Sequence, residues 1–144
     1  MSPGTSGSTR RTAAEKIAAA AAEYERRRTG RAPLAVSVVL GGETLVITLH
    51  GTLSPAERAV AVTPAGAAEL QAYRRRLLDS SAAAFLQEIE NITGARVREA
   101  AAEAVPTTGT VVTVFTTGTV VQVYLLAGGV PTDTWSGGGP PPPP

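Results

Sequence analysis

The sequence predicts an α+β domain in which one antiparallel sheet of four or five strands carries helices on one of its faces. Two long stretches place apolar residues at helical spacing, and two other stretches alternate β-branched residues with small or polar ones. Short glycine-containing turns join the members of each strand pair, which makes the pairs antiparallel hairpins. The 144 residues suit one domain, with the expected order helix, strand, strand, helix, helix, strand, strand.

The first helix is expected over residues 13–28. Alanine is the strongest helix former, and a narrow stripe of residues recurs at helical spacing: Ile17, Ala21, Tyr24 and Arg28. Three arginines at 26–28 occupy the last turn, where the helix dipole favours positive charge. Gly30 then provides the C-terminal stop.

A β-hairpin is expected over residues 34–49. Large aliphatic residues alternate along both strands, and Gly41-Gly42 supplies a two-residue turn that permits positive φ. With that turn Leu34 faces Leu49, and most of the large aliphatic side chains share one face. The other face carries smaller and more polar side chains, and it suits either solvent or a subunit interface.

Two helices are expected next. Ser54-Pro55-Ala56-Glu57 is a capping box that opens a short helix ending near Val62. Thr63-Pro64 breaks this helix and starts a second one, because the residue before proline avoids the α region. The second helix is expected to reach Ile92.

Arg74 lies inside the apolar sector of that second helix, between Leu70 and Leu78. Two interpretations fit this position. The methylenes of Arg74 cover the edge of the core while the guanidinium reaches water, or a partly buried guanidinium pairs with a carboxylate. Glu57 is the expected partner in the second case, because the break at Thr63 can fold the short helix back onto the long one.

The rest of the chain is less regular. Residues 96–105 fit either a strand or a frayed helix, whereas residues 110–115 and 119–126 are β-branched and predict a second hairpin. Residues 1–12 and 128–144 are expected to be disordered tails, which leaves a folded domain over residues 13–127. Five prolines at 140–144 favour polyproline II, as a solvated tail or as a ligand for a proline-recognition domain.

Composition argues against several classes of function. A net charge of +1 is too small for a strong nucleic-acid binder. The chain has no Cys and one His, so neither an enzyme nor a metal or cofactor site is expected, and no catalytic residue is assigned. There is no apolar run long enough to span a bilayer and no signal-peptide pattern. Direct membrane insertion is therefore not expected, and the expected location is the cytoplasm.

The order of the motifs resembles the MpsC-like family, which is named after a sodium-translocating, membrane potential-generating system. The matching elements are the first helix leading to Gly30-Arg31-Ala32-Pro33, the strand pair, Gly51 with the capping box, the arginine-bearing helix, Thr93-Gly94, and the closing strand over residues 121–126. The family tends to have a second Gly where Ala32 stands. The resemblance covers roughly residues 13–127 and implies an association with membrane energetics through a partner.

These observations favour a non-enzymatic accessory or protein-interaction domain with an unidentified protein partner. A homodimer is also expected, because a sheet with a semi-apolar second face and open edges needs cover. The alternative is a small-ligand or anion sensor. The candidate binding residues are Arg31, His50, Glu57 and Arg74.

Overall fold

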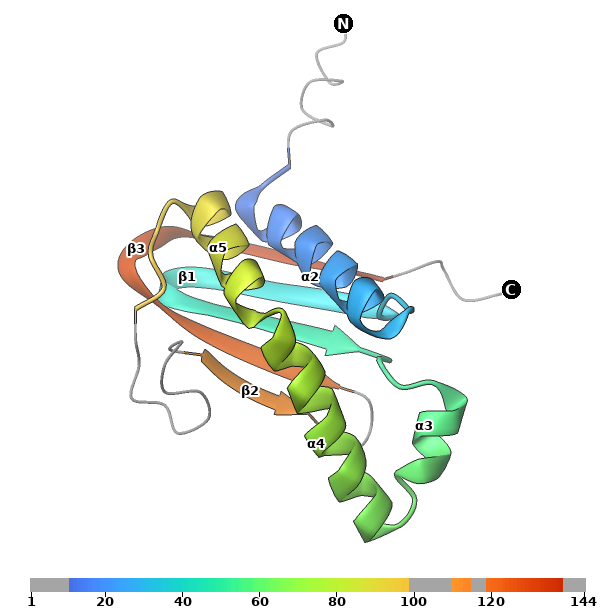
Figure 1. Ribbon diagram of the computed structural model, residues 1–144. Helices are drawn as coiled ribbons and strands as arrows, with labels where there is room; N and C mark the ends of the chain where they lie inside the picture. Colours follow the sequence, from blue (N-terminus) through green and yellow to red (C-terminus); the bar gives the residue numbers. More distant parts are fainter. Residues whose placement is uncertain (1–10, 99–109, 115–118, 139–144) are drawn as a thin grey trace, which may run out of the picture.

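The protein is an α+β domain, as predicted, with helices packed on one antiparallel sheet (Figure 1). The computed structural model describes residues 11–98, 110–114 and 119–138. Its elements are α2 (Ala13–Thr29), β1 (Ala35–His50), α3 (Pro55–Val60), α4 (Pro64–Ser80), α5 (Ala82–Thr93), β2 (Thr110–Val114) and β3 (Val120–Gly138). Within these ranges none of the helices combines the length and apolar character needed to cross a bilayer.

The strand β1 turns back on itself at Gly41-Gly42. Sixteen residues in one straight strand would separate its ends by about 50 Å. Instead the Leu34 amide donates a hydrogen bond of 2.8 Å to the His50 carbonyl, rather than to Leu49, the partner predicted from the turn. Gly42 has a positive φ of 58°. The turn at Gly41-Gly42 is therefore present, but the two arms form one continuous element.

The strand β3 pairs antiparallel with both arms of β1. Its first part, from Val120 to Leu125, lies opposite the second arm of β1, and its last part, up to Gly138, lies opposite the first arm. The strand β2 pairs with β3 on the other side, which gives the order β1-β3-β2. The predicted count of four or five strands is therefore wrong for the described chain, which has three, because the two arms of the first hairpin run on through their turn as one strand.

Residues 128–138 are not the disordered tail that the sequence predicts. They form the last part of β3 and pair with β1, from Gly42 opposite Val130 to Ala35 opposite Gly138. The first arm of β1 offers free backbone donors and acceptors, and this segment satisfies them despite its glycine-rich composition. The rest of that predicted tail, and residues 1–10, lie outside the described residues.

The segment after α5 is partly described. Val97 forms a single antiparallel bridge with Leu126, and backbone hydrogen bonds join Arg98 to Leu125 and Ala127 to Arg96. Of the two alternatives for residues 96–105, the described part, up to Arg98, therefore follows the strand alternative. The remainder lies outside the described residues.

The predicted second helix is in fact two, so the predicted element order is wrong. The break comes at Ser81, whose φ and ψ of −116° and 7° are not helical. Ser80 and Ser81 both donate their side-chain hydroxyls to carbonyls of the last turn of α4, and such bonds compete with the helical ladder. In the described part of this stretch, three helices therefore follow β1. The predicted capping box is confirmed, since both of its hydrogen bonds between Ser54 and Glu57 are present.

The core lies between the sheet and the helices α2 and α5, which run side by side over one face (Figure 1). The sheet contributes the aliphatic residues that the alternation predicted, apart from the exposed Leu34. The helix α2 contributes mainly alanines, whose small side chains let the helix lie close to the strands. The largest fully buried side chains include Ile17, Val38, Leu40, Leu45, Ile47, Leu49, Ile89, Val120 and Leu126.

The carboxylate of Asp133, in the last part of β3, accepts a hydrogen bond from the first turn of α2. The Ala14 amide donates a 2.8 Å hydrogen bond to Asp133 Oδ2, and the Glu15 amide donates to the Thr12 hydroxyl. Asp133 thus satisfies an amide that has no partner within the helix and also places negative charge at the positive end of its dipole.

We expect Asp133→Ala to lower the free energy of unfolding by about 1 kcal/mol, because the first turn of α2 loses a hydrogen-bond acceptor and a favourable charge. Denaturant unfolding measures the change. Asp79→Ala is the control, since Asp79 is exposed on α4. Equal effects of the two substitutions would contradict this role of Asp133.

Candidate functional site

A buried charge cluster joins α2 to α4. Glu25 Oε2 accepts a 2.5 Å hydrogen bond from Arg74 Nη2, and Glu25 Oε1 accepts one of 3.1 Å from Arg28 Nη2. The side chains of Glu25 and Arg74 are almost fully buried, and that of Arg28 is 7% exposed. One carboxylate thus neutralises only one of two guanidinium groups in this cluster.

The surrounding helices fix the positions of these three side chains. Glu25 follows Ala21 by four residues on the buried stripe of α2, and Arg74 lies between Leu70 and Leu78 on the buried side of α4. Arg28 also donates a 2.9 Å hydrogen bond to the Ser81 hydroxyl, at the break between α4 and α5. The cluster therefore holds the last turns of α2 against α4 and its junction with α5.

Burial and charge change the acidity of two groups here. Burial lowers the pKa of Arg28, Glu25 opposes that change, and the positive charge of Arg74 adds to it. Burial also raises the pKa of the Tyr124 phenol, while nearby Arg28 opposes the shift. Tyr124 stays protonated and packs against Phe85, with ring centroids 6.1 Å apart.

Two buried polar atoms of the described residues have no hydrogen-bond partner. They are Nη1 of Arg74 and Oε1 of Gln122. A buried donor left without a partner costs about 1–3 kcal/mol, and more when it is charged. Arg74 therefore retains an unused capacity to bind an acceptor.

The structure does not bring the four predicted binding residues together. Arg31 is exposed just after the left-handed residue Gly30, and His50 is exposed at the end of β1. Glu57 uses its carboxylate in the capping box, where it accepts a 2.9 Å hydrogen bond from the Ser54 amide. The predicted pairing of Arg74 with Glu57 is therefore wrong, although Arg74 is buried and paired, as the second interpretation of its position required.

Sequence reasoning missed Glu25, and it placed Arg28 on the stripe of the first helix without assigning it a binding role. Four-residue steps from Ile17 through Ala21 lead to Glu25, and this spacing was the available signal. A glutamate on an apolar stripe is rarely buried without a partner.

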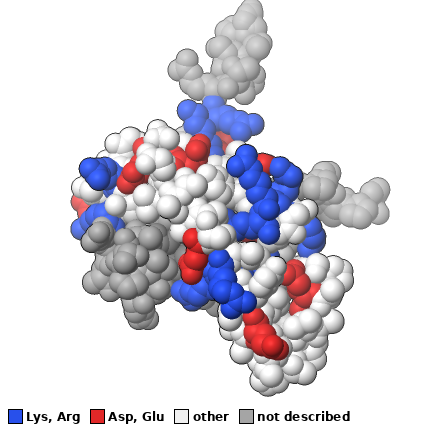
Figure 2. Space-filling model, in the orientation of Figure 1, with Lys and Arg blue, Asp and Glu red and all other residues white. Residues whose placement is uncertain are grey.

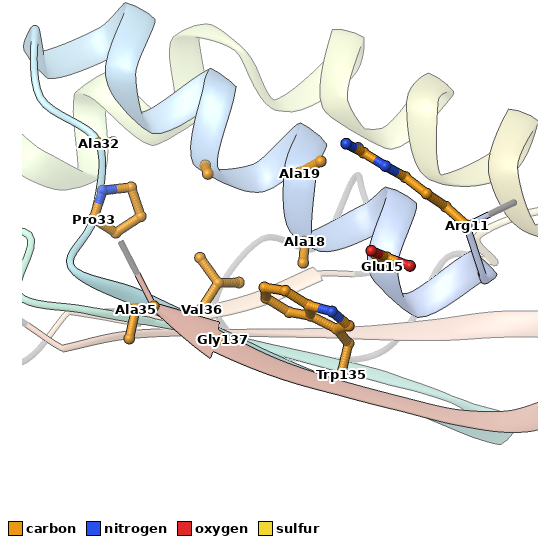
Figure 3. Close-up of a pocket in the computed structure, with 12 residues that line it drawn as sticks. Arg11, Glu15, Ala18, Ala19, Ala32, Pro33, Ala35, Val36, Trp135 and Gly137 are labelled. Atoms are coloured by element: carbon orange, nitrogen blue, oxygen red, sulfur yellow. The ribbon is translucent and has the colours of Figure 1, made fainter. Parts of the chain in front are cut away.

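A separate apolar pocket of about 290 Å³ lies between α2 and the paired ends of β1 and β3. Figure 3 shows the Trp135 ring beneath Ala18 of α2, with Pro33 and Val36 on one side and Arg11 and Glu15 at the other end. A second hollow, of about 270 Å³, lies near Asp133 and Ile92. Neither hollow is lined by the residues of the charge cluster.

We expect Glu25→Gln to lower the free energy of unfolding by roughly 3–5 kcal/mol, because it strands two buried guanidinium groups. Arg74→Met should cost less, since Glu25 keeps Arg28 as a partner. The double variant should lose less than the sum of the two single losses, because the pair is coupled. Denaturant unfolding of the four proteins measures these differences.

Glu23→Gln is the matched control. Glu23 lies on the same helix and also pairs with two arginines, Arg26 and Arg27, but all three side chains are solvent-accessible. Exposed pairs contribute little to stability, so this change should barely move the unfolding midpoint. A loss for Glu25→Gln no larger than that for Glu23→Gln would overturn the assigned role of the cluster.

Comparison with known proteins gives one family. The family described as "Na+-translocating membrane potential-generating system (MpsC)" matches residues 9–119. Searches of the curated proteins and of the solved structures both found no match. The matched residues include α2, β1, the three following helices and β2, and end before β3. Because the match spans most of the chain and agrees with the motif order, the chain belongs to the MpsC family.

Proposed function

We propose that this chain is a non-enzymatic accessory domain that binds another protein of a Na⁺-translocating, membrane potential-generating system. The family description supplies the system, and it does so by name only. The observation that carries the proposal is an exposed apolar arm. This arm, which we call the α3–α4 arm, consists of residues 55–73.

The α3–α4 arm extends away from the sheet and from α2 (Figure 1). The helix α3 buries none of its residues. Of the five large hydrophobic side chains that are exposed in the described residues, three lie on the arm: Val60, Val62 and Tyr73. Val62 is 80% exposed. Exposed apolar side chains on a projecting element are consistent with a protein-interaction surface.

The shape and charge of the arm also suit a docking role. A Cβ at Gly66 would lie 2.0 Å from the Val60 carbonyl oxygen. The helices α3 and α4 therefore meet too closely for any residue other than glycine at position 66. This tight contact holds Val60 and Val62 in place before a partner binds. In Figure 2 the surface at the lower right, where the arm lies, is mostly uncharged and carries some acidic side chains, whereas basic side chains gather over α2.

A photo-crosslinking amino acid at Val62 tests the proposal in native cells. We expect one specific adduct with another component of the Na⁺-translocating system, identified by mass spectrometry. The same crosslinker at Ala83, exposed on α5, is the control and should give no such adduct. Equal adducts at both positions, or none at Val62, would overturn the proposal, and an adduct of twice the chain's mass would indicate the homodimer instead.

A small-anion sensor is the second candidate, and the unpartnered Nη1 of Arg74 favours it. The proposed site is the Glu25, Arg28 and Arg74 cluster, which has an excess positive charge, in place of the predicted set with Arg31 and Glu57. An anion that binds the folded state raises the melting temperature in a saturable way.

Thermal unfolding in phosphate or acetate, at ionic strength matched with chloride, tests this second function. We expect a saturable rise in melting temperature for the natural protein and none for Arg74→Met. Equal responses of the two proteins, or no difference from chloride, would exclude the cluster as the anion site.

A further inference from the structure

The apolar pocket beneath α2 has the chemistry of a proline-binding groove. Trp135 and Pro33 supply two rigid rings, and Ala18, Ala22 and Val36 complete an apolar wall (Figure 3). Proteins that recognise polyproline II segments use grooves of this kind, lined by aromatic rings. A volume of about 290 Å³ is enough for a small apolar group.

Gly137 allows the tryptophan ring to take its place in this wall. A Cβ at Gly137 would lie 2.3 Å from the Trp135 ring, so any larger residue there would displace the indole from this position. Among the described residues the indole N–H has no hydrogen-bond partner. It can therefore donate to a backbone carbonyl, and a proline segment offers carbonyls but no N–H groups.

The chain itself carries a ligand of this chemistry. Five prolines occupy residues 140–144, starting two residues after Gly138, which lines the pocket. A proline run favours polyproline II, in which the backbone carbonyls make no internal hydrogen bonds. The segment and the pocket are thus complementary in ring shape and in hydrogen bonding.

The direction of β3 favours a second copy of the chain over the same copy. β3 runs from Trp135 towards Gly138, whose partner on β1 is Ala35, so the chain leaves the sheet away from the Trp135 end of the pocket. To lie back over Trp135, the same chain would have to reverse within Gly139 and the first prolines. Proline lacks the N–H that closes a tight turn, which opposes such a reversal.

We propose that the pocket formed by Pro33, Val36, Trp135 and the alanine face of α2 binds the proline segment at 140–144 of a second copy of this chain. The contact is separate from the α3–α4 arm, which lies elsewhere on the molecule (Figure 1). Each copy has one pocket and one proline segment, so the contact links copies either in a closed pair or in a chain.

Trp135 is the only tryptophan, so its fluorescence reports directly on the pocket. The protein for the titration is the full chain with the five prolines at 140–144 replaced by serine, which leaves the pocket without its own ligand. A synthetic peptide, Ser-Gly-Gly-Gly followed by five prolines, is added. We expect a saturable change in Trp135 emission, and no change with a peptide that has five alanines instead.

Pocket variants locate the binding. Ala19→Leu and Ala22→Leu each fill the pocket from α2 and should weaken peptide binding more than tenfold without moving the unfolding midpoint. Ala83→Leu on α5 is the matched control and should bind as before. If one pocket variant unfolds, the other variant still tests whether peptide binding depends on the pocket. Equal binding by the folded pocket variants and the control would overturn the site.

Light scattering of the natural protein shows whether the proline segment binds the pocket of its own copy or that of a second copy. We expect its mass by light scattering to rise with concentration, and to return to that of one chain when excess proline peptide is added. A mass of one chain at every concentration, together with the emission of the peptide-bound state, would show that the segment binds its own pocket and would overturn the proposal. No response of Trp135 to the peptide would also overturn it.

Discussion

The pairing of β3 with both arms of β1 is the constraint on which the rest of the structure depends. It runs from Ala35 opposite Gly138 to Leu49 opposite Val120. These contacts join segments about 70 to 100 residues apart in sequence, so they close large loops at an entropic cost that rises only slowly with loop length. Once formed, they satisfy the backbone of the first arm of β1 and position β3 beneath the helices.

The contact of Asp133 with α2 and the Trp135 pocket both follow from that pairing. The last part of β3 brings Asp133 to the first turn of α2 and Trp135 to the pocket beneath the same helix. Its first part brings Gln122 and Tyr124 to the buried side of the sheet. The charge cluster of Glu25, Arg28 and Arg74 then joins α2 to α4, which packs less extensively on the core. A buried ion cluster is costly to assemble and still more costly to break, so it selects one arrangement of these helices.

The surfaces differ in what they can do. The charge cluster is buried and mainly positions helices, whereas the α3–α4 arm and the Trp135 pocket face solvent and suit binding. The family match includes the arm but ends before β3, so it does not include Trp135. The pocket combines α2 and β1 residues that lie within the match with Trp135, Gly137 and Gly138, which lie beyond it.

Local signals in the sequence determined several of the elements and some of their ends. Helical spacing placed α2, the Ser54 and Glu57 side chains closed the capping box, and Gly41-Gly42 turned β1, because each depends on residues only a few positions apart. The place of Arg74 in the apolar sector of its helix was also predictable, since a helical face depends only on spacing. Only the tertiary structure decided that Glu25 is its partner, that residues 128–138 form a strand, and that Trp135 lines a pocket. Those three facts depend on contacts between distant segments, and local spacing carries no information about which distant segment comes to lie alongside.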